Sequence, residues 1–165
     1  MTGGLAGFLN DLDHTEATRV LLDCCGSERW AEEMLLQRPF PDDESVFDHA
    51  TRIWWNLAPG DWLEAFARHP RIGDPGVVGV AGREQARVRN ASAETRRALA
   101  RANQEYEERF GHVFLICASG LEAEEMLGAL RARLRNEPAT ELANAAEEQL
   151  KITRLRLHHL RGKEP

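Results

Sequence analysis

Apolar side chains recur at spacings of three and four residues along most of this sequence, which places them on one face of an α-helix. Residues that cap helix N-termini precede many of these stretches, as Asp13, Ser27, Asp43 and Asp61 do. Glycine or proline follows several of them, as expected where helices end. We therefore expect an all-α fold, a bundle of six to eight helices around one core.

These signals also predict where the helices begin and end. Pro59 and Gly60 are expected to break the chain between two of them, and Pro138 suits the first turn of the last one. The expected helices cover residues 14–24, 28–37, 44–57, 62–68, 93–109, 121–135 and 138–159.

The stretch His112 to Ala118 is the one part of the sequence with the composition of a β-strand. It is too short to build a sheet by itself. We expect a short, buried, extended segment near residues 112–118, between two helices.

Length and composition indicate the class of protein. The 165 residues suit one domain over 1–165, and 42% hydrophobic residues suffice for a core. The formal net charge of −6, with basic and acidic residues interspersed, argues against a nucleic-acid partner. No stretch is apolar and long enough to cross a bilayer, so no membrane partner is expected.

The three cysteines, Cys24, Cys25 and Cys117, have neither the pairing of a disulfide framework nor the spacing of a metal site. The first ten residues do not look like a secretory signal, and the C-terminus carries no peroxisomal address. We expect a cytoplasmic protein with reduced thiols, no metal and no cofactor.

His69 and Pro70 form the first candidate site. Proline disfavours helical backbone at the preceding residue, so a helix is expected to end at His69 with the imidazole at a fixed angle. An imidazole that titrates near neutral pH suits general acid–base catalysis. The alternative is a histidine that the helix dipole favours at a C-terminus.

Glu84 and Gln85 form the second candidate, at the start of a helical turn after a glycine-rich stretch. A carboxylate beside an amide can orient a histidine or accept hydrogen bonds from ureido N–H groups. The alternative is an ordinary acidic residue in a first helical turn.

Arg156 is the third candidate, because it shares a helical stripe with the mostly apolar residues 142, 145, 149 and 152. A guanidinium in such a place can bind a substrate carboxylate through two parallel hydrogen bonds. The alternative is a side chain that extends its charged end to solvent, or an ion pair within the protein. Arg154 faces another way and is a weaker candidate.

The motifs together resemble the OHCU decarboxylases, which act on 2-oxo-4-hydroxy-4-carboxy-5-ureidoimidazoline (OHCU). The resemblance covers residues 5–160, and its ordered set of motifs is more specific than any one of them. The matching segments are residues 69–74 (HPRIGD), 84–85 (EQ), 103–111 (NQEYEERFG), 114–118 (FLICA), Arg133, Leu134, Asn136, Glu141, and residues 151–157 (KITRLRL).

The resemblance implies a role for each matching position. His69 looks like the catalytic histidine and Glu84 like its acidic partner. The residues that it implies for substrate binding are Pro70, Ala81, Gln85, Phe114, Leu115, Ile116 and Arg156. Two positions depart from the family pattern. Ala81 replaces a serine that often binds substrate, and His112 stands where many relatives have phenylalanine.

The activity that this resemblance implies is cofactor-independent decarboxylation of OHCU to (S)-allantoin in urate breakdown. It also implies a homodimer, for which the tryptophan-bearing helices offer apolar surface. Two alternatives stay open at this point. One is a catalytically silent helical interaction module on the same scaffold, and the other is a different small-molecule lyase or hydrolase that acts on a ureide.

Overall fold

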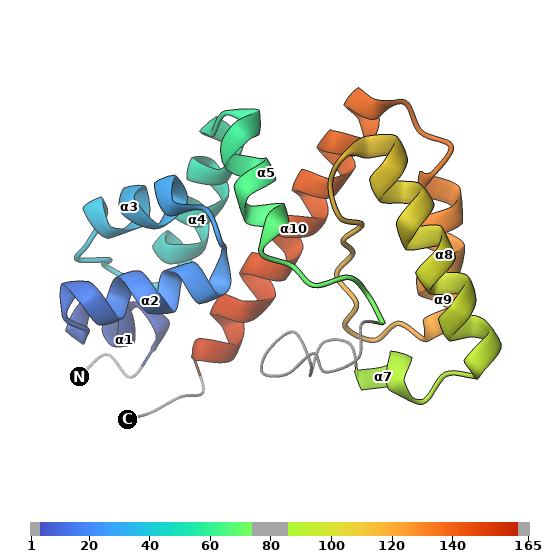
Figure 1. Ribbon diagram of the computed structural model, residues 1–165. Helices are drawn as coiled ribbons and strands as arrows, with labels where there is room; N and C mark the ends of the chain where they lie inside the picture. Colours follow the sequence, from blue (N-terminus) through green and yellow to red (C-terminus); the bar gives the residue numbers. More distant parts are fainter. Residues whose placement is uncertain (1–3, 74–85, 162–165) are drawn as a thin grey trace. The chain divides into compact units, whose positions relative to one another are not determined.

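The computed structural model describes residues 4–73 and 86–161, and within these ranges it is helical with no β-strand. Figure 1 labels the elements. Eight helices have seven residues or more, and α7 is a single turn. Their bounds are α1 Leu5–Asp11, α2 His14–Cys24, α3 Glu28–Leu36, α4 Asp43–Asn56, α5 Pro59–Ala67, α7 Ala86–Arg89, α8 Ala93–Phe110, α9 Ala123–Arg133 and α10 Pro138–Leu160. The all-α prediction is confirmed.

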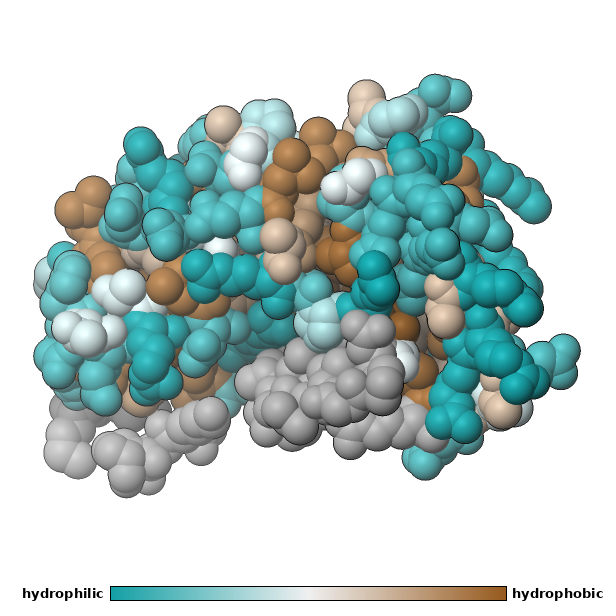
Figure 2. Space-filling view, viewed as in Figure 1, coloured by the Kyte–Doolittle hydropathy of each residue, from teal (hydrophilic) through white to brown (hydrophobic). Residues whose placement is uncertain are grey.

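The chain packs as two compact units, residues 1–65 with 149–165 and residues 66–148. The expectation of one domain over residues 1–165 stays a prediction. In the described residues no helix combines the length and apolar character needed to cross a membrane. Figure 2 shows hydrophilic residues over most of the visible face, with apolar side chains in separate patches.

In the first unit, α3 packs against both α2 and α4, and α1 packs against α4. Its largest buried side chains are Trp30 and Trp54, which are 0% and 1% exposed. The predicted caps Asp13 and Ser27 accept hydrogen bonds from Glu16 N and Trp30 N, at 2.8 and 3.2 Å. Cys24, Cys25 and Cys117, which all lie in the described residues, form no disulfide.

The predicted start of α4 is wrong by one residue. Asp42, not Asp43, caps this helix by accepting a 2.8 Å hydrogen bond from Ser45 N. The carboxylate of Asp43 instead accepts from Ala6 N in α1, at 2.9 Å, and pairs with Arg161 at 2.8 Å. Asp43 therefore stabilises the start of α1, a helix that the sequence analysis did not predict.

The predicted break between two helices occurs, but it lies at Leu57 and Ala58 rather than at Pro59 and Gly60. Pro59 and Gly60 lie in the first turn of α5. Proline lacks an N–H, but this costs no hydrogen bond in the first turn, because N–H groups there have no acceptor within the helix. Asp61 is not the cap, and its carboxylate reaches back to Ala58 N at 3.3 Å. Proline breaks a helix when it stands in the interior, but Pro59 is the first residue of α5.

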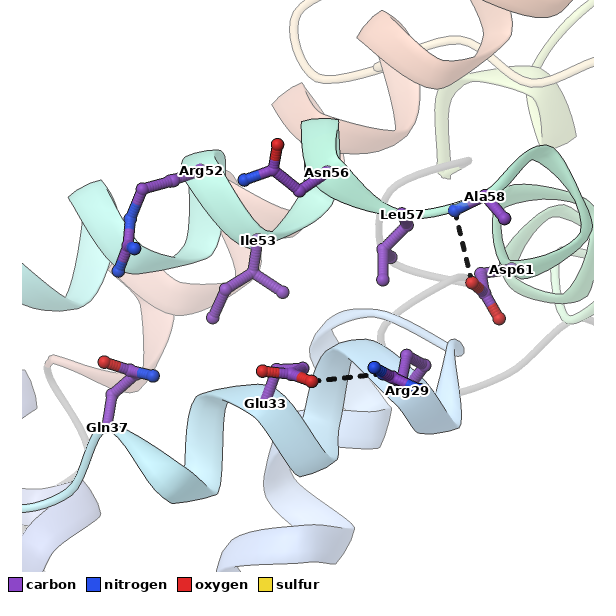
Figure 3. Close-up of a pocket in the computed structure, with 9 residues that line it drawn as sticks. All are labelled: Arg29, Glu33, Gln37, Arg52, Ile53, Asn56, Leu57, Ala58 and Asp61. Atoms are coloured by element: carbon purple, nitrogen blue, oxygen red, sulfur yellow. Dashed lines mark hydrogen bonds and ion pairs between the residues drawn. The ribbon is translucent and has the colours of Figure 1, made fainter.

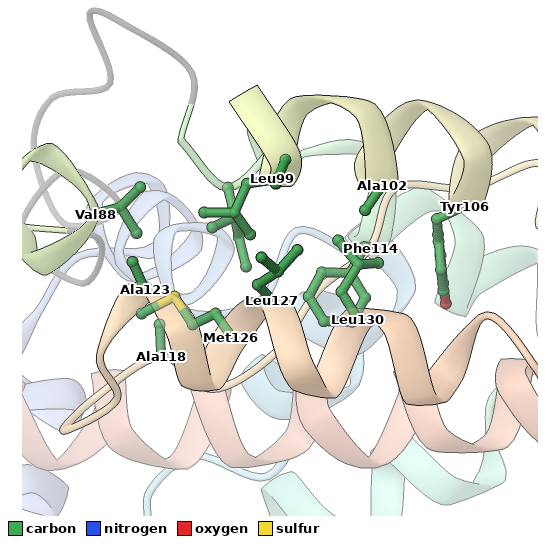
Figure 4. Close-up of a cluster of buried hydrophobic side chains, with 12 residues drawn as sticks. Val88, Leu99, Ala102, Tyr106, Phe114, Ala118, Ala123, Met126, Leu127 and Leu130 are labelled. Carbon is green, nitrogen blue, oxygen red and sulfur yellow. The ribbon is translucent and has the colours of Figure 1, made fainter. Parts of the chain in front are cut away.

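In the second unit, α8 lies beside α9 (Figure 1), and both helices contribute apolar side chains to one core. Ser92 caps α8 by accepting a hydrogen bond from Thr95 N, and Gly111 ends it with a φ of +76°. Figure 4 shows the core of this unit, to which α7, α8, α9 and the stretch after α8 contribute. Pro138 begins α10, as predicted, whereas α9 is shorter at both ends than residues 121–135.

Candidate functional site

His69 and Pro70 lie directly after α5, in a segment that we call the His69 loop (residues 69–73). The N–H of His69 donates a 3.0 Å hydrogen bond to the carbonyl of Phe66, which ends the helix in a tight turn. Both His69 and Pro70 are half-buried. α5 ends at Ala67, two residues before His69, where the sequence analysis expected the helix to end.

Arg71 and Ile72 of the His69 loop form contacts with side chains of α8. The guanidinium of Arg71 forms two contacts with the carboxylate of Glu107, at 3.0 and 2.8 Å. Ile72 is 6% exposed and belongs to the core. Its carbonyl accepts a 3.0 Å hydrogen bond from Asn103 Nδ2.

The second part of the candidate site is the extended segment (residues 112–118), which is neither helix nor strand, as predicted. Phe114 and Leu115 are 0% and 2% exposed. Arg133 Nη1 donates a 2.7 Å hydrogen bond to the carbonyl of Leu115, and the N–H of Cys117 donates to Glu148 Oε2 at 3.0 Å. The extended segment has no helical or sheet hydrogen bonds, and side chains of α9 and α10 bond to its backbone instead.

Among the described residues, the N–H of Cys117 is the one backbone donor of the extended segment that has an acceptor, and the N–H groups of Leu115 and Ile116 are among those that remain available. No described residue accepts a hydrogen bond from the N–H of Leu115 or of Ile116. Buried backbone N–H groups in folded proteins are nearly always paired with protein or with water, so these donors can take a polar ligand as their partner.

A buried polar network, formed by Tyr106, Arg133, Asn136 and Glu141, supports this segment. Glu141 is 0% exposed. Its carboxylate accepts from the hydroxyl of Tyr106, from Arg133 Nε at 2.6 Å and from Asn136 Nδ2 at 3.0 Å. Arg133 Nη2 also lies 2.5 Å from Glu141 Oε1. This contact is an ion pair, and Nη2 forms no hydrogen bond with the described residues.

The network shifts the acidities of its members. Burial alone would raise the pKa of Glu141, but the hydrogen bonds from Arg133, Asn136 and Tyr106 lower it below its ordinary value. Burial and the adjacent carboxylate raise the pKa of Tyr106. Glu141 is therefore a structural anion at neutral pH. The sequence comparison matched Arg133, Asn136 and Glu141 to the family but gave them no role.

His112 is half-buried among aromatic rings at the start of the extended segment. Its ring centroid lies 5.4 Å from that of Phe66, 5.5 Å from that of Tyr106 and 6.3 Å from that of Phe110. Its Nδ1 lies 3.2 Å from the carbonyl oxygen of Val113. Burial lowers the pKa of His112, which favours the neutral imidazole at neutral pH.

The remaining predicted site residues are not brought together by the described structure. Ala81, Glu84 and Gln85 lie outside the described residues. Arg156 belongs to the first unit, where its Nη1 donates a 3.1 Å hydrogen bond to the carbonyl of Asp23 near the end of α2. The convergence of the imidazole of His69, the acid at position 84 and this guanidinium stays a prediction.

Arg154 is held by α4. Its Nη1 donates to Thr51 Oγ1 at 2.9 Å, and its guanidinium lies 5.1 Å from the centroid of the Phe47 ring. These contacts account for Arg154 as a residue that joins α10 to α4 within the first unit.

The first unit also contains an open cavity of about 440 Å³ between α3, α4 and the start of α5 (Figure 3). None of the predicted site residues that the structure describes lines it. Its walls carry charges of both signs, with Arg29 and Glu33 paired at 3.1 Å across one turn of α3.

Comparison with known proteins identifies the family. The family model for OHCU decarboxylase matches residues 10–158. The uric acid degradation bifunctional protein TTL of Arabidopsis thaliana is 40% identical over 146 residues, which are 83% of this chain and 45% of that protein. The OHCU decarboxylase of Amia calva is 50% identical over 60 residues, 36% of this chain and 34% of that protein.

A crystal structure of an OHCU decarboxylase in the presence of (S)-allantoin is also similar. It has 39% sequence identity and a TM-score of 0.77, and the match covers 84% of this chain and 94% of that one. The chain spans less than half the length of the first two bifunctional relatives, 45% of the Arabidopsis protein and 31% of a Bacillus protein. The extent of the family match shows that this chain belongs to the OHCU decarboxylase family.

Proposed function

We propose that this chain decarboxylates OHCU to (S)-allantoin, without an external cofactor, as a step of urate degradation. Membership of the family supports this activity, since similar proteins are named for OHCU decarboxylation and for uric acid degradation. The structural observation that carries the proposal is that the N–H groups of Leu115 and Ile116 have no acceptor among the described residues. Both lie in the segment that the family resemblance selects for substrate contact.

For this reaction the protein has to orient the substrate and to stabilise the negative charge that develops on the ring carbon. The bond between the ring carbon and its carboxylate breaks, carbon dioxide leaves, and the electron pair stays on a carbon next to ring atoms that accept electrons. A proton then adds to that carbon from one face, which gives the S product. Fixed hydrogen-bond donors stabilise the charge that develops before protonation.

Each predicted residue takes a defined part in this proposal. His69 transfers the proton, and Pro70 contacts the substrate beside it. Glu84 orients the imidazole, while Gln85 and the backbone of residues 114–116 bind the ureido and ring groups. Arg156 binds the carboxylate, and its bond to the carbonyl of Asp23 orients the guanidinium for this task. Ala81 offers no hydroxyl, so that contact is lost or supplied elsewhere.

Wild-type protein tests the proposal directly. OHCU decays spontaneously, so circular dichroism should follow allantoin formation from freshly made substrate with and without enzyme. We expect a faster reaction and an excess of the S enantiomer. A racemic product formed at the spontaneous rate would support a silent module instead. In a thermal-shift assay, a functional site should bind allantoin and raise Tm, whereas a silent module should not.

We further propose that the protein is a cytoplasmic homodimer. Three large apolar side chains of the first unit are exposed: Leu36 by 76%, Trp55 by 44% and Leu63 by 41%. Exposed side chains of this size suit an interface with a second copy. Light scattering should give twice the mass of the chain, and Trp55→Ser should shift the protein towards the monomer. A monomeric mass for the wild type at all concentrations would contradict the dimer.

A further inference from the structure

Asn103 is the polar exception on the buried face of α8. It is 1% exposed and lies among Leu99, Ala102 and Tyr106, which belong to the core. An amide in such surroundings reduces stability unless both its donor and its acceptor are satisfied. Packing therefore does not explain this residue, because an apolar side chain of similar size would suit the core better.

Among the described residues, only one half of this amide has a partner. Nδ2 donates to the carbonyl of Ile72, three residues after His69, at 3.0 Å. The acceptor Oδ1 is fully buried and has no hydrogen-bond partner in the part of the chain that the structure describes. The one bond that Asn103 makes thus leads to the backbone of the His69 loop.

Neighbouring contacts hold the same loop from the same side of α8. Glu107 lies one helical turn after Asn103 and pairs with Arg71. Gly73, with a φ of +89°, approaches Val88 of α7, so that an added Cβ would lie 3.4 Å from its Cγ1. Two consecutive residues of the loop, Arg71 and Ile72, are therefore held by side chains of α8.

We propose that Asn103 is a positioning residue, which holds the His69 loop through the carbonyl of Ile72 and so places the imidazole for proton transfer. The proposal rests on the proposed function, in which His69 is the proton-transfer group. Asn103 itself does not touch the substrate. Small displacements of a catalytic group are costly, since an error of about 1 Å can reduce the rate on the order of 100-fold.

The test compares two amide-to-leucine changes at adjacent positions. Asn103→Leu removes the bond to Ile72. Gln104→Leu is the matched control, because Gln104 is exposed and its amide donates to Glu108 at 3.0 Å. We expect Asn103→Leu to lower kcat on the order of 100-fold with a much smaller change in KM, and Gln104→Leu to leave both constants within about twofold of wild type.

A double-mutant cycle separates positioning from general damage. If Asn103 acts through His69, Asn103→Leu should cause little further loss in a His69→Ala background. An equal loss in both backgrounds, or full activity of Asn103→Leu, would overturn the proposal. Should Asn103→Leu fail to fold by circular dichroism, Asn103→Ala carries the same test, since its smaller side chain cannot overlap with the core.

A measurement without substrate keeps this inference distinct from the proposed function. In NMR spectra, the Cε1–H resonance of His69 is assigned by its loss in His69→Ala. It should move in Asn103→Leu and stay in place in Gln104→Leu, and no movement in either variant would refute the positioning role. If wild-type protein does not accelerate OHCU decarboxylation, the proposed function fails, while this comparison still decides whether Asn103 places His69.

Discussion

Arg133 Nη1 donates a 2.7 Å hydrogen bond to the carbonyl oxygen of Leu115, in the middle of the extended segment. The same guanidinium pairs with the buried carboxylate of Glu141 and lies 4.6 Å from the centroid of the Phe114 ring. One side chain of α9 thus joins the substrate-contact segment that we propose to the first turn of α10.

Arg133→Met should therefore be severely destabilising. It leaves the carboxylate of Glu141 buried without its ion-pair partner, and removal of one partner of a buried pair costs about 3–5 kcal/mol. Arg131→Met is the matched control, because Arg131 is exposed on the same helix, and it should change the free energy of unfolding by less than about 0.5 kcal/mol. Urea denaturation checks both, and equal effects would contradict the role given to Arg133.

The acid stability of the protein should depend on Glu141. Its pKa in the folded state lies below the ordinary value of 4.5, so it contributes stability above pH 4.5 that is lost as the pH falls through the lower folded value. Between about pH 3 and about pH 6, wild type should lose stability more steeply than Glu141→Gln, which is destabilised but has no such ionisation. Glu137→Gln, at an exposed position before α10, should retain the wild-type slope.

His112→Phe should remove a different dependence on pH. Because burial lowers the pKa of His112 in the folded state, the unfolded chain takes up the proton first as the pH falls below 6.5. The stability associated with the neutral ring is therefore present above pH 6.5 and declines below it. The Tm of His112→Phe relative to wild type should rise as the pH falls through this range, and a constant difference would show that His112 does not titrate as described.

Local signals predicted most of the fold. Caps such as Asp13 and Ser27, and glycines such as Gly111, act within their own helix, so the sequence alone locates them. The unpredicted helix α1 shows the limit, since its start is stabilised by Asp43, 37 residues further along the chain. Pro59 shows another limit, because proline is as compatible with a first helical turn as with a break.

The candidate site was predictable only in part. His69 and the extended segment are visible because proline and β-branched residues mark them locally. The polar network joins Tyr106, Arg133 and Glu141 across three helices, and no spacing rule connects such positions. Asn103 did leave a signal, as the polar member of an apolar stripe, but its partner Ile72 lies 31 residues away.

The two arginines of α10 should respond differently to substitution. Arg156→Met should raise the KM for OHCU, because we propose that this guanidinium binds the substrate carboxylate. Arg154→Met should instead lower Tm with little effect on KM, since Arg154 contacts Thr51 and Phe47 of α4. Steady-state kinetics and thermal unfolding of both variants check this, and exchanged effects would assign the substrate contact to Arg154.

The most direct test of the account is the handedness of the allantoin that His69→Ala produces. His159→Ala is the control, since this imidazole is exposed near the end of α10. We predict that His69→Ala loses about 10²- to 10⁴-fold in rate, the usual contribution of a positioned acid or base, and that its product approaches a racemate while His159→Ala gives the S enantiomer at the wild-type rate. Undiminished formation of (S)-allantoin by His69→Ala would contradict the central claim.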